Sequence, residues 1–190
     1  LGIHSLIIFL NLFFINYLNG IDYLANLLIY SIIILIPFLV FNFPKAKIFL
    51  GDSGSYFLGA FIAVAVIQTS IENPQISPFY FCILLFYLFF EVFFSFIRKV
   101  LFEKKSPLFP DKKHLHMLLY ENLFNKNKNK LKSNYSVSVI VNLIYFVLTI
   151  PAIFMMKNGL FCKYYSLVFF IIYLFSYKAC RNKINKLNNY

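Results

Sequence analysis

The sequence predicts an all-α fold, a polytopic membrane helix bundle, and two observations lead to this prediction. Hydrophobic residues make up 61% of the chain and charged residues only 13%, whereas about 25% charged residues is usual for a soluble domain. The apolar residues are also concentrated in runs of roughly 20 residues, the length that a helix needs to cross a bilayer. We therefore treat residues 1–190 as a single integral-membrane domain.

Six apolar runs are candidate membrane spans. They cover approximately residues 3–18, 24–43, 55–71, 79–97, 136–156 and 161–177, and the first and last are short. The third helix is expected to begin near Ser55, because Ser53 and Ser55 can cap its first turn. Pro74 and Pro78 bracket the turn between the third and fourth runs.

Prolines also mark the end of the fourth span. Pro107 and Pro110 stop a continuous helix after that run, and residues 98–135 are expected to form a cytoplasmic loop. Asn and Lys dominate residues 125–134, where we expect a solvated loop tip. Pro151 lies inside the fifth run and is expected to kink it, since neighbouring helices can satisfy the freed carbonyl group.

The basic residues between the spans alternate from one connection to the next. Residues 98–135 carry ten basic and three acidic side chains, residues 42–54 carry Lys45 and Lys47, and the tail after residue 177 carries four basic side chains. Residues 19–23 and 72–78 carry none, and residues 157–163 carry two. The positive-inside rule therefore predicts that the first three segments face the cytoplasm. Both polar segments that could carry chemistry then meet at one membrane face.

The net charge of +11 is compatible in principle with nucleic-acid binding. The lysines lie between hydrophobic spans rather than on one soluble face, so we expect no nucleic-acid partner. We expect the basic segments to attract anionic membrane lipid instead. The three cysteines have no paired spacing and predict neither a disulfide nor a metal site.

The first polar segment, NFPKAKIFLGDSGS, spans residues 42–55 and places Asp52 between Gly51 and Gly54. A carboxylate at the membrane edge needs water, a partner or a metal ion, and glycines let the backbone approach a ligand closely. Asp52 is therefore a candidate ligand for Mg²⁺, which typically takes one or two carboxylates and completes its shell with substrate phosphates and water. The alternative is that Asp52 and Ser53 only cap the following helix.

The second polar segment, SPLFPDKKHLHMLLY, spans residues 106–120. His114 and His116 cannot share one face of a helix, and no further His or Cys in the segment completes a zinc site. Lys112 and Lys113 precede the pair, and imidazole and ammonium groups are good hydrogen-bond donors to a diphosphate. The segment therefore predicts anion binding, and the alternative is a solvated basic loop.

Glu91 lies inside an apolar run that Arg98 ends. An intramembrane carboxylate is a functional candidate in its own right. The spacing of seven residues places Glu91 and Arg98 on one helix face, about two turns apart. A structural ion pair, or a hydrogen bond to a neighbouring helix, is at least as well supported by this pattern as a catalytic role.

In these two polar segments the chain resembles the polyprenyl-phosphate N-acetylhexosamine-1-phosphate transferases (glycosyltransferase family 4), which include phospho-MurNAc-pentapeptide translocase. Residues 42–55, followed by an apolar helix, are similar to the family's cytoplasmic metal loop. Residues 106–116 resemble its His-X-His loop, in the same order. Residues 72–78, and Glu91 before Arg98, are similar to the bacterial cell-surface-polysaccharide branch. The resemblance covers most of residues 40–125.

The resemblance implies a bacterial inner-membrane enzyme with its active face in the cytoplasm. Such an enzyme transfers a sugar-1-phosphate, in this family an N-acetylhexosamine-1-phosphate, from a UDP-sugar to undecaprenyl phosphate, and uses Mg²⁺ or Mn²⁺. This step initiates cell-surface glycan synthesis. By position, Asp52 matches the family's catalytic and metal-binding aspartate. By position, His114 and His116 match the His pair that the family associates with the nucleotide-sugar diphosphate. Lys112, Lys113 and Lys47 are the further predicted substrate-binding residues.

Two motifs of the family are missing. Family members carry an Asp-Asp motif and an Asp-Gly-X-X-Gly motif in earlier loops, and Leu1 would follow just after the second, so the resemblance implies that this chain is the C-terminal half of a longer enzyme. The alternative is a non-catalytic membrane remnant or accessory half. A small transporter is a third interpretation, but it predicts polar residues at mid-membrane, and apart from Glu91 the spans contain almost none.

Overall fold

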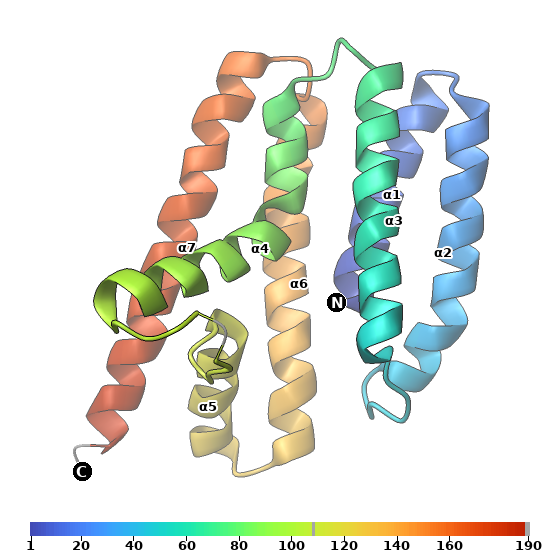
Figure 1. The fold of residues 1–190 in the computed structure, drawn as a ribbon. Coiled ribbons are helices and arrows are strands. Elements are labelled where there is room, and N and C mark those ends of the chain that lie inside the picture. The colour runs from blue at the N-terminus through green and yellow to red at the C-terminus, as the bar shows by residue number, and fades with distance from the viewer. Residues whose placement is uncertain (108, 189–190) are drawn as a thin grey trace. The chain divides into compact units, whose positions relative to one another are not determined.

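The structure is a computed structural model that describes residues 1–107 and 109–188, with side chains described up to residue 186. Within these residues it contains helices and no strand (Figure 1), so the all-α prediction is confirmed. Leu108, in the second polar segment, lies outside the described residues. In chain order the helices are α1 (Gly2–Leu18), α2 (Asp22–Asn42), α3 (Gly51–Glu72), α4 (Pro78–Ile97), the π-helical turn η1 (Arg98–Phe102), α5 (Leu115–Asn127), α6 (Lys130–Phe154) and α7 (Gly159–Asn188).

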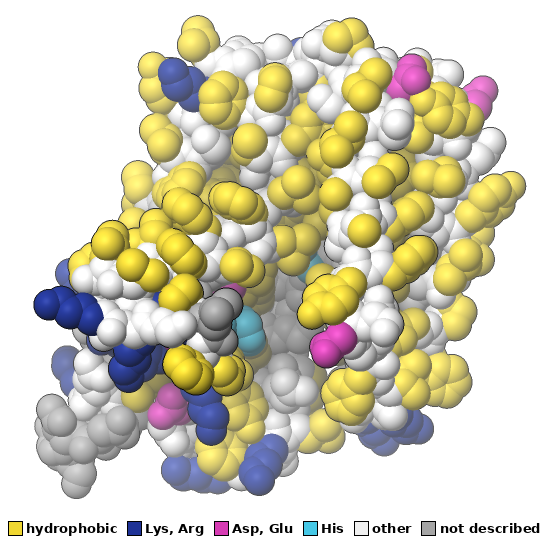
Figure 2. Space-filling view, viewed as in Figure 1, with side chains coloured by type: hydrophobic (Ala, Val, Ile, Leu, Met, Phe, Trp, Pro, Cys, Tyr) yellow, Lys and Arg dark blue, Asp and Glu magenta, His cyan; other side chains and the backbone are white. Residues whose placement is uncertain are grey.

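Five of these segments are long and apolar enough to cross a membrane, namely α2, α3, α4 with η1, α6 and α7. The apolar helix α1 is shorter. Together they coincide with the six predicted runs. Many large hydrophobic side chains are exposed along them, including Ile34 at 76% and Phe175 at 75%, and hydrophobic side chains cover much of the visible surface (Figure 2). Such a surface suits lipid rather than water, so the chain is a multi-pass membrane protein with a helical-bundle fold.

The helices form two compact units, which are described separately. The first unit contains Leu1–Leu84 and Phe146–Lys163. The second unit contains residues from Leu85 to Tyr145 and from Tyr164 onward. Helices α4, α6 and α7 therefore each contribute to both units.

In the first unit, α1 packs against α2 and α3. Ile8, Leu12 and Leu28 are completely buried in this core. Two hydrogen bonds between buried side chains tie α1 to the end of α3: Asn16 Nδ2 donates to Thr69 Oγ1 at 2.8 Å, and Asn73 Nδ2 donates to Asn16 Oδ1 at 3.2 Å. Hydrogen bonds of this kind contribute about 0.6 kcal/mol each in membrane proteins, so they fix the register of the helices more than they stabilise them.

In the second unit, aromatic rings join α4 to α7. The rings of Phe90 and Phe170 meet edge to face with centroids 4.5 Å apart. One turn further along, Phe94 and Tyr177 meet in the same way at 4.8 Å. Edge-to-face pairs are favourable beyond the area that they bury. This packing aligns the two helices so that Glu91 on α4 lies within hydrogen-bond distance of Tyr173 on α7.

Two predictions are wrong: the start of the third helix and the loop tip at residues 125–134. Helix α3 begins at Gly51 rather than near Ser55, because Gly51 adopts a φ of +66° and turns the chain directly into the helix. Residues 98–135 contain η1, α5 and the start of α6, and only Lys128 and Asn129 separate the last two. Lys128 closes α5 in the left-handed conformation, with a φ of 53°. The expected loop tip at residues 125–134 is therefore a two-residue turn.

The start of α3 at Gly51 can be tested by substitution. Gly51→Ala is expected to lower the free energy of unfolding by about 1–2 kcal/mol, because a residue with a Cβ is strained at positive φ. Gly59 is the matched control: it lies inside α3, and an added Cβ would meet no atom within 4 Å. Gly59→Ala should not destabilise, since alanine is the better helix former. Thermal unfolding in detergent measures both changes, and equal midpoints for the two variants would contradict this start of α3.

Candidate functional site

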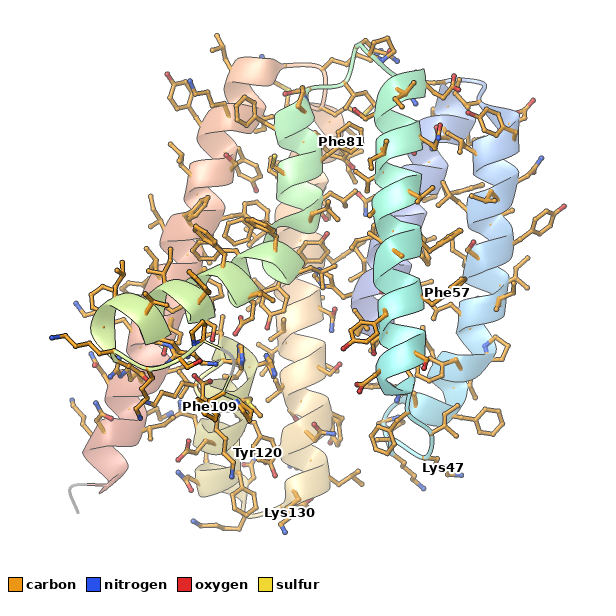
Figure 3. The ribbon with its side chains drawn as sticks, viewed as in Figure 1. Lys47, Phe57, Phe81, Phe109, Tyr120 and Lys130 are labelled. Atoms are coloured by element: carbon orange, nitrogen blue, oxygen red, sulfur yellow. The ribbon has the colours of Figure 1, made fainter. Side chains whose placement is uncertain are left out.

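The connection between α2 and α3 is held by Asn42. Its Nδ2 donates to the backbone carbonyl oxygen of Ile48 at 2.7 Å, and its backbone carbonyl oxygen accepts from the Ala46 N–H at 2.7 Å. The Lys47 N–H donates to the carbonyl oxygen of Phe41 at 3.0 Å. These bonds fold the connection back onto the end of α2, where the Lys47 side chain is exposed (Figure 3).

Asp52 is exposed in the first turn of α3. The N-cap of this helix is Leu50, and no side-chain hydrogen bond caps it. The capping role that the sequence left open for Asp52 and Ser53 is therefore not seen. Within the described part of the chain, no hydrogen bond or ion pair engages the Asp52 side chain. The positive end of the helix dipole favours a carboxylate here, and both of its oxygens are free to bind a ligand.

His114 and His116 lie on either side of the start of α5. His114 precedes the helix with an extended backbone (φ −70°, ψ 149°), and His116 lies in its first turn. Their rings are stacked, with centroids 5.7 Å apart and planes inclined by 18°. The change of backbone conformation between them therefore gives two alternate residues a common side, which a helix alone would not do.

Glu91 makes the contact that positions this pair. Its side chain is 9% exposed. Its Oε1 lies 3.1 Å from His114 Nδ1 and accepts a hydrogen bond from the Leu115 N–H at 2.8 Å. Its Oε2 accepts from the Tyr173 hydroxyl at 2.9 Å. Of the roles that the sequence left open for Glu91, the hydrogen bond to a neighbouring helix is confirmed.

Arg98 does not pair with Glu91, and its partners follow it in the sequence. The buried guanidinium donates to Glu103 Oε1 and Asp111 Oδ2, each at 2.7 Å. Lys99 adds two further anchors, since its Nζ donates to the carbonyl oxygens of Pro107 at 3.2 Å and Phe109 at 2.6 Å. These contacts hold the described residues between η1 and α5 against the end of α4. The sequence signal for them was the pair of acidic residues in an otherwise basic segment.

The same contacts change the acidity of the two carboxyl groups. The hydrogen bond from Lys113 lowers the pKa of Glu103 below its ordinary value, and the bond from Arg98 adds to this effect. Partial burial alone would raise the pKa of Asp111, but hydrogen bonds from Arg98 and from the Lys113 N–H lower it overall.

The two predicted substrate-binding lysines before the His pair differ in their surroundings. The Lys113 ammonium donates to Glu103 Oε1 at 2.8 Å, so it already has an anionic partner. Lys112 is exposed and lines a groove of about 570 Å³ together with His116. Tyr120 also lines this groove, on the helix that Figure 3 shows beside the start of α6.

The predicted site residues are divided between the two units. Asp52 and Lys47 belong to the first unit, and both histidines with Lys112 and Lys113 belong to the second. The part of the chain that the structure describes contains no group of three or more His, Cys, Asp or Glu side chains that could hold a metal ion. A metal ion on Asp52 could complete its shell with substrate phosphates and water, as Mg²⁺ typically does.

The chain is similar to members of one known protein family. Residues 1–70, which include Asp52, match the family described as glycosyl transferase family 4. The chain is 39% identical over 105 residues to the undecaprenyl-phosphate alpha-N-acetylglucosaminyl 1-phosphate transferase of Thermotoga maritima, a match that covers 52% of this chain and 33% of that protein. It is 32% identical over 139 residues to the probable undecaprenyl-phosphate N-acetylglucosaminyl 1-phosphate transferase of Bacillus subtilis, covering 72% of this chain and 36% of that protein.

The chain belongs to glycosyl transferase family 4. It spans about a third of the length of these two relatives. No solved structure matches it at a significant level. The resemblance seen in the two polar segments is therefore confirmed at the level of the family.

Acid is expected to release the segment between η1 and α5 of this family 4 protein. The folded-state pKa values of Glu103 and Asp111 lie below their unfolded values, so their stabilisation is complete at neutral pH and is lost as the pH falls below about 4. Hydrogen exchange measures this as lost protection of the Lys113 amide, which donates to Asp111 Oδ1 at 3.0 Å. Asp111→Asn should weaken that protection already at neutral pH. Protection that stays constant to pH 3 would contradict the role of these ion pairs.

Proposed function

We propose that this protein takes part in the transfer of N-acetylhexosamine-1-phosphate from a UDP-sugar to undecaprenyl phosphate. The similarity to the two undecaprenyl-phosphate transferases carries this proposal, because their names state both the lipid acceptor and the N-acetylglucosaminyl 1-phosphate group. The reaction takes place at the cytoplasmic face of the bacterial inner membrane and initiates a cell-surface glycan. The basic connections of the chain support that orientation.

Asp52 is the proposed catalytic residue and the ligand for Mg²⁺ or Mn²⁺. Its exposed carboxylate, without a protein partner in the described residues, is the hard oxygen donor that these ions prefer. A bound ion would supply positive charge to the diphosphate and to the in-line attack by the lipid phosphate. Gly51, which has no side chain, turns the backbone so that Asp52 lies in the first turn of α3.

His114, His116 and Lys112 are the proposed donors to the diphosphate of the UDP-sugar. The stacked rings present two donors at the start of α5, and Lys112 adds a charge beside His116 along the same groove. Charge-assisted hydrogen bonds to phosphate oxygens are about twice as strong as neutral ones. Lys113 contributes indirectly by neutralising Glu103, and Lys47 adds positive charge beside Asp52.

The competing proposal is an accessory or remnant role without catalysis. The two proposals differ in what Asp52 does, since only catalysis requires its charge.

Asp52→Asn in the complete natural protein is expected to lower transfer activity by about 100-fold or more, because the charge stabilisation that a metal ion supplies is worth several kcal/mol. The measurement is UMP-dependent exchange into the UDP-sugar by membranes that contain the protein, across a range of Mg²⁺ concentrations. Raising Mg²⁺ should not restore the variant.

Asp22→Asn is the matched control. Asp22 is also an exposed acidic residue in the first turn of an apolar helix, α2, and its loss should leave exchange unchanged. If Asp52→Asn behaves like Asp22→Asn, the carboxylate of Asp52 has no catalytic role and the accessory proposal stands.

A further inference from the structure

We propose that Glu91 is a positioning residue for His114. Glu91 binds the Nδ1 atom of the ring and leaves Nε2 for the ligand. The inference rests on the proposed function, in which His114 donates to a diphosphate. It assigns to an intramembrane carboxylate a task that the sequence pattern did not assign to it.

The first step is the direction of the hydrogen bonds at Glu91. Three groups surround its carboxylate, and two of them, the Leu115 N–H and the Tyr173 hydroxyl, are donors at 2.8 and 2.9 Å. An ionised carboxylate only accepts. With Glu91 as an ionised acceptor, the third neighbour, His114 Nδ1 at 3.1 Å, is the donor, and we assign a proton to that atom.

The second step concerns the other ring nitrogen. With Nδ1 bound to Glu91, His114 Nε2 is the atom that remains for a ligand. Its nearest acidic neighbour is Asp111 Oδ1 at 3.9 Å, which is too long for a hydrogen bond. Asp111 is also neutralised by Arg98 at 2.7 Å and by Lys99 at 3.6 Å. The His114 side chain is 27% exposed, so the ring is partly open to a ligand.

The third step is the charge. Donation from Nε2 to a phosphate while Nδ1 donates to Glu91 requires a proton on both nitrogens, and the ring is then positive. A carboxylate in contact with the ring balances that charge. Carboxylate partners orient metal-bound histidines in the same way. Tyr173 in turn holds Glu91 from α7, so three helices define the position of one imidazole.

A purely structural role is the competing explanation, because the bond from the Leu115 N–H shows that Glu91 also caps α5. Such a cap would stabilise the segment whether or not His114 were present. The two explanations therefore differ in whether the effect of changing Glu91 depends on His114.

A double-mutant cycle separates them. In the complete natural protein, Glu91→Gln is expected to lower kcat/KM for the UDP-sugar by about 10- to 100-fold, and His114→Ala by about 10- to 150-fold. If Glu91 acts through His114, adding Glu91→Gln to His114→Ala should cause little further loss. Losses that multiply in the double variant would overturn the proposal.

The matched control is Glu72→Gln. Glu72 also accepts a hydrogen bond from a tyrosine hydroxyl, that of Tyr23, but it lies in the other unit and has no histidine partner. This change should leave kcat/KM for the UDP-sugar unaltered in both backgrounds. A loss as large as that from Glu91→Gln would show that the substitution acts through helix packing, against the proposal.

A second measurement does not depend on activity. Residues 1–190 contain three histidines. The ¹⁵N-histidine NMR signals of His114 in the full protein are assigned by comparison with His114→Ala. His114 should show a protonated Nδ1, and Glu91→Leu should abolish that signature. An unprotonated Nδ1, or no change in Glu91→Leu, would overturn the proposal. If no UDP-sugar-dependent transfer is found, the proposed function fails, and NMR alone decides whether Glu91 fixes the ring.

Discussion

A carboxyl group inside a membrane helix must find its hydrogen-bond partners in the protein, because lipid offers none. In the second unit this requirement falls on Glu91, and the position of its donors sets the local structure. The start of α5 lies against α4 because the Leu115 N–H binds Glu91. Helix α7 is held in register by the Tyr173 hydroxyl, in line with the aromatic pairs beside it. The same contact sets the position of the His pair, because His114 and His116 lie on either side of the start of α5, which Glu91 binds.

The carboxylate of Asp52, in the first unit, shows the opposite arrangement. Asp52 is exposed, and no described residue binds its side chain. The backbone around it is nevertheless fixed by Asn42 and by the positive φ of Gly51. A charged group that is held in place but left unpaired is suited to bind an external cation. Glu91, in contrast, already has three hydrogen-bond partners within the protein. The contrast separates the carboxylate proposed to touch metal from the one proposed to orient a histidine.

Hydropathy was sufficient to predict the spans, because lipid requires long apolar helices and composition reports them directly. It was insufficient where local backbone conformation decides. The early start of α3 depends on the φ of Gly51, and α5 lies in a segment whose prolines and charges obscure its helical pattern. The seven-residue spacing suggested Glu91 and Arg98 as partners, but Glu103 and Asp111 lie closer to Arg98 after the π-helical turn. Asp52 and the His pair could be named in advance as candidates, because the pattern that suggests them is local to two short segments.

The central claim is that both polar segments serve one reaction and therefore face one side of the membrane. Single cysteines at Lys45, Asn127 and Gln75, all exposed positions, test it in a background where Cys82, Cys162 and Cys180 are replaced by alanine. An impermeant thiol reagent added to intact cells should label the cysteine at Gln75. It should reach those at Lys45 and Asn127 only after the cells are opened. Labelling of either Lys45 or Asn127 in intact cells would place the two segments on opposite faces, or both outside, and would contradict the account.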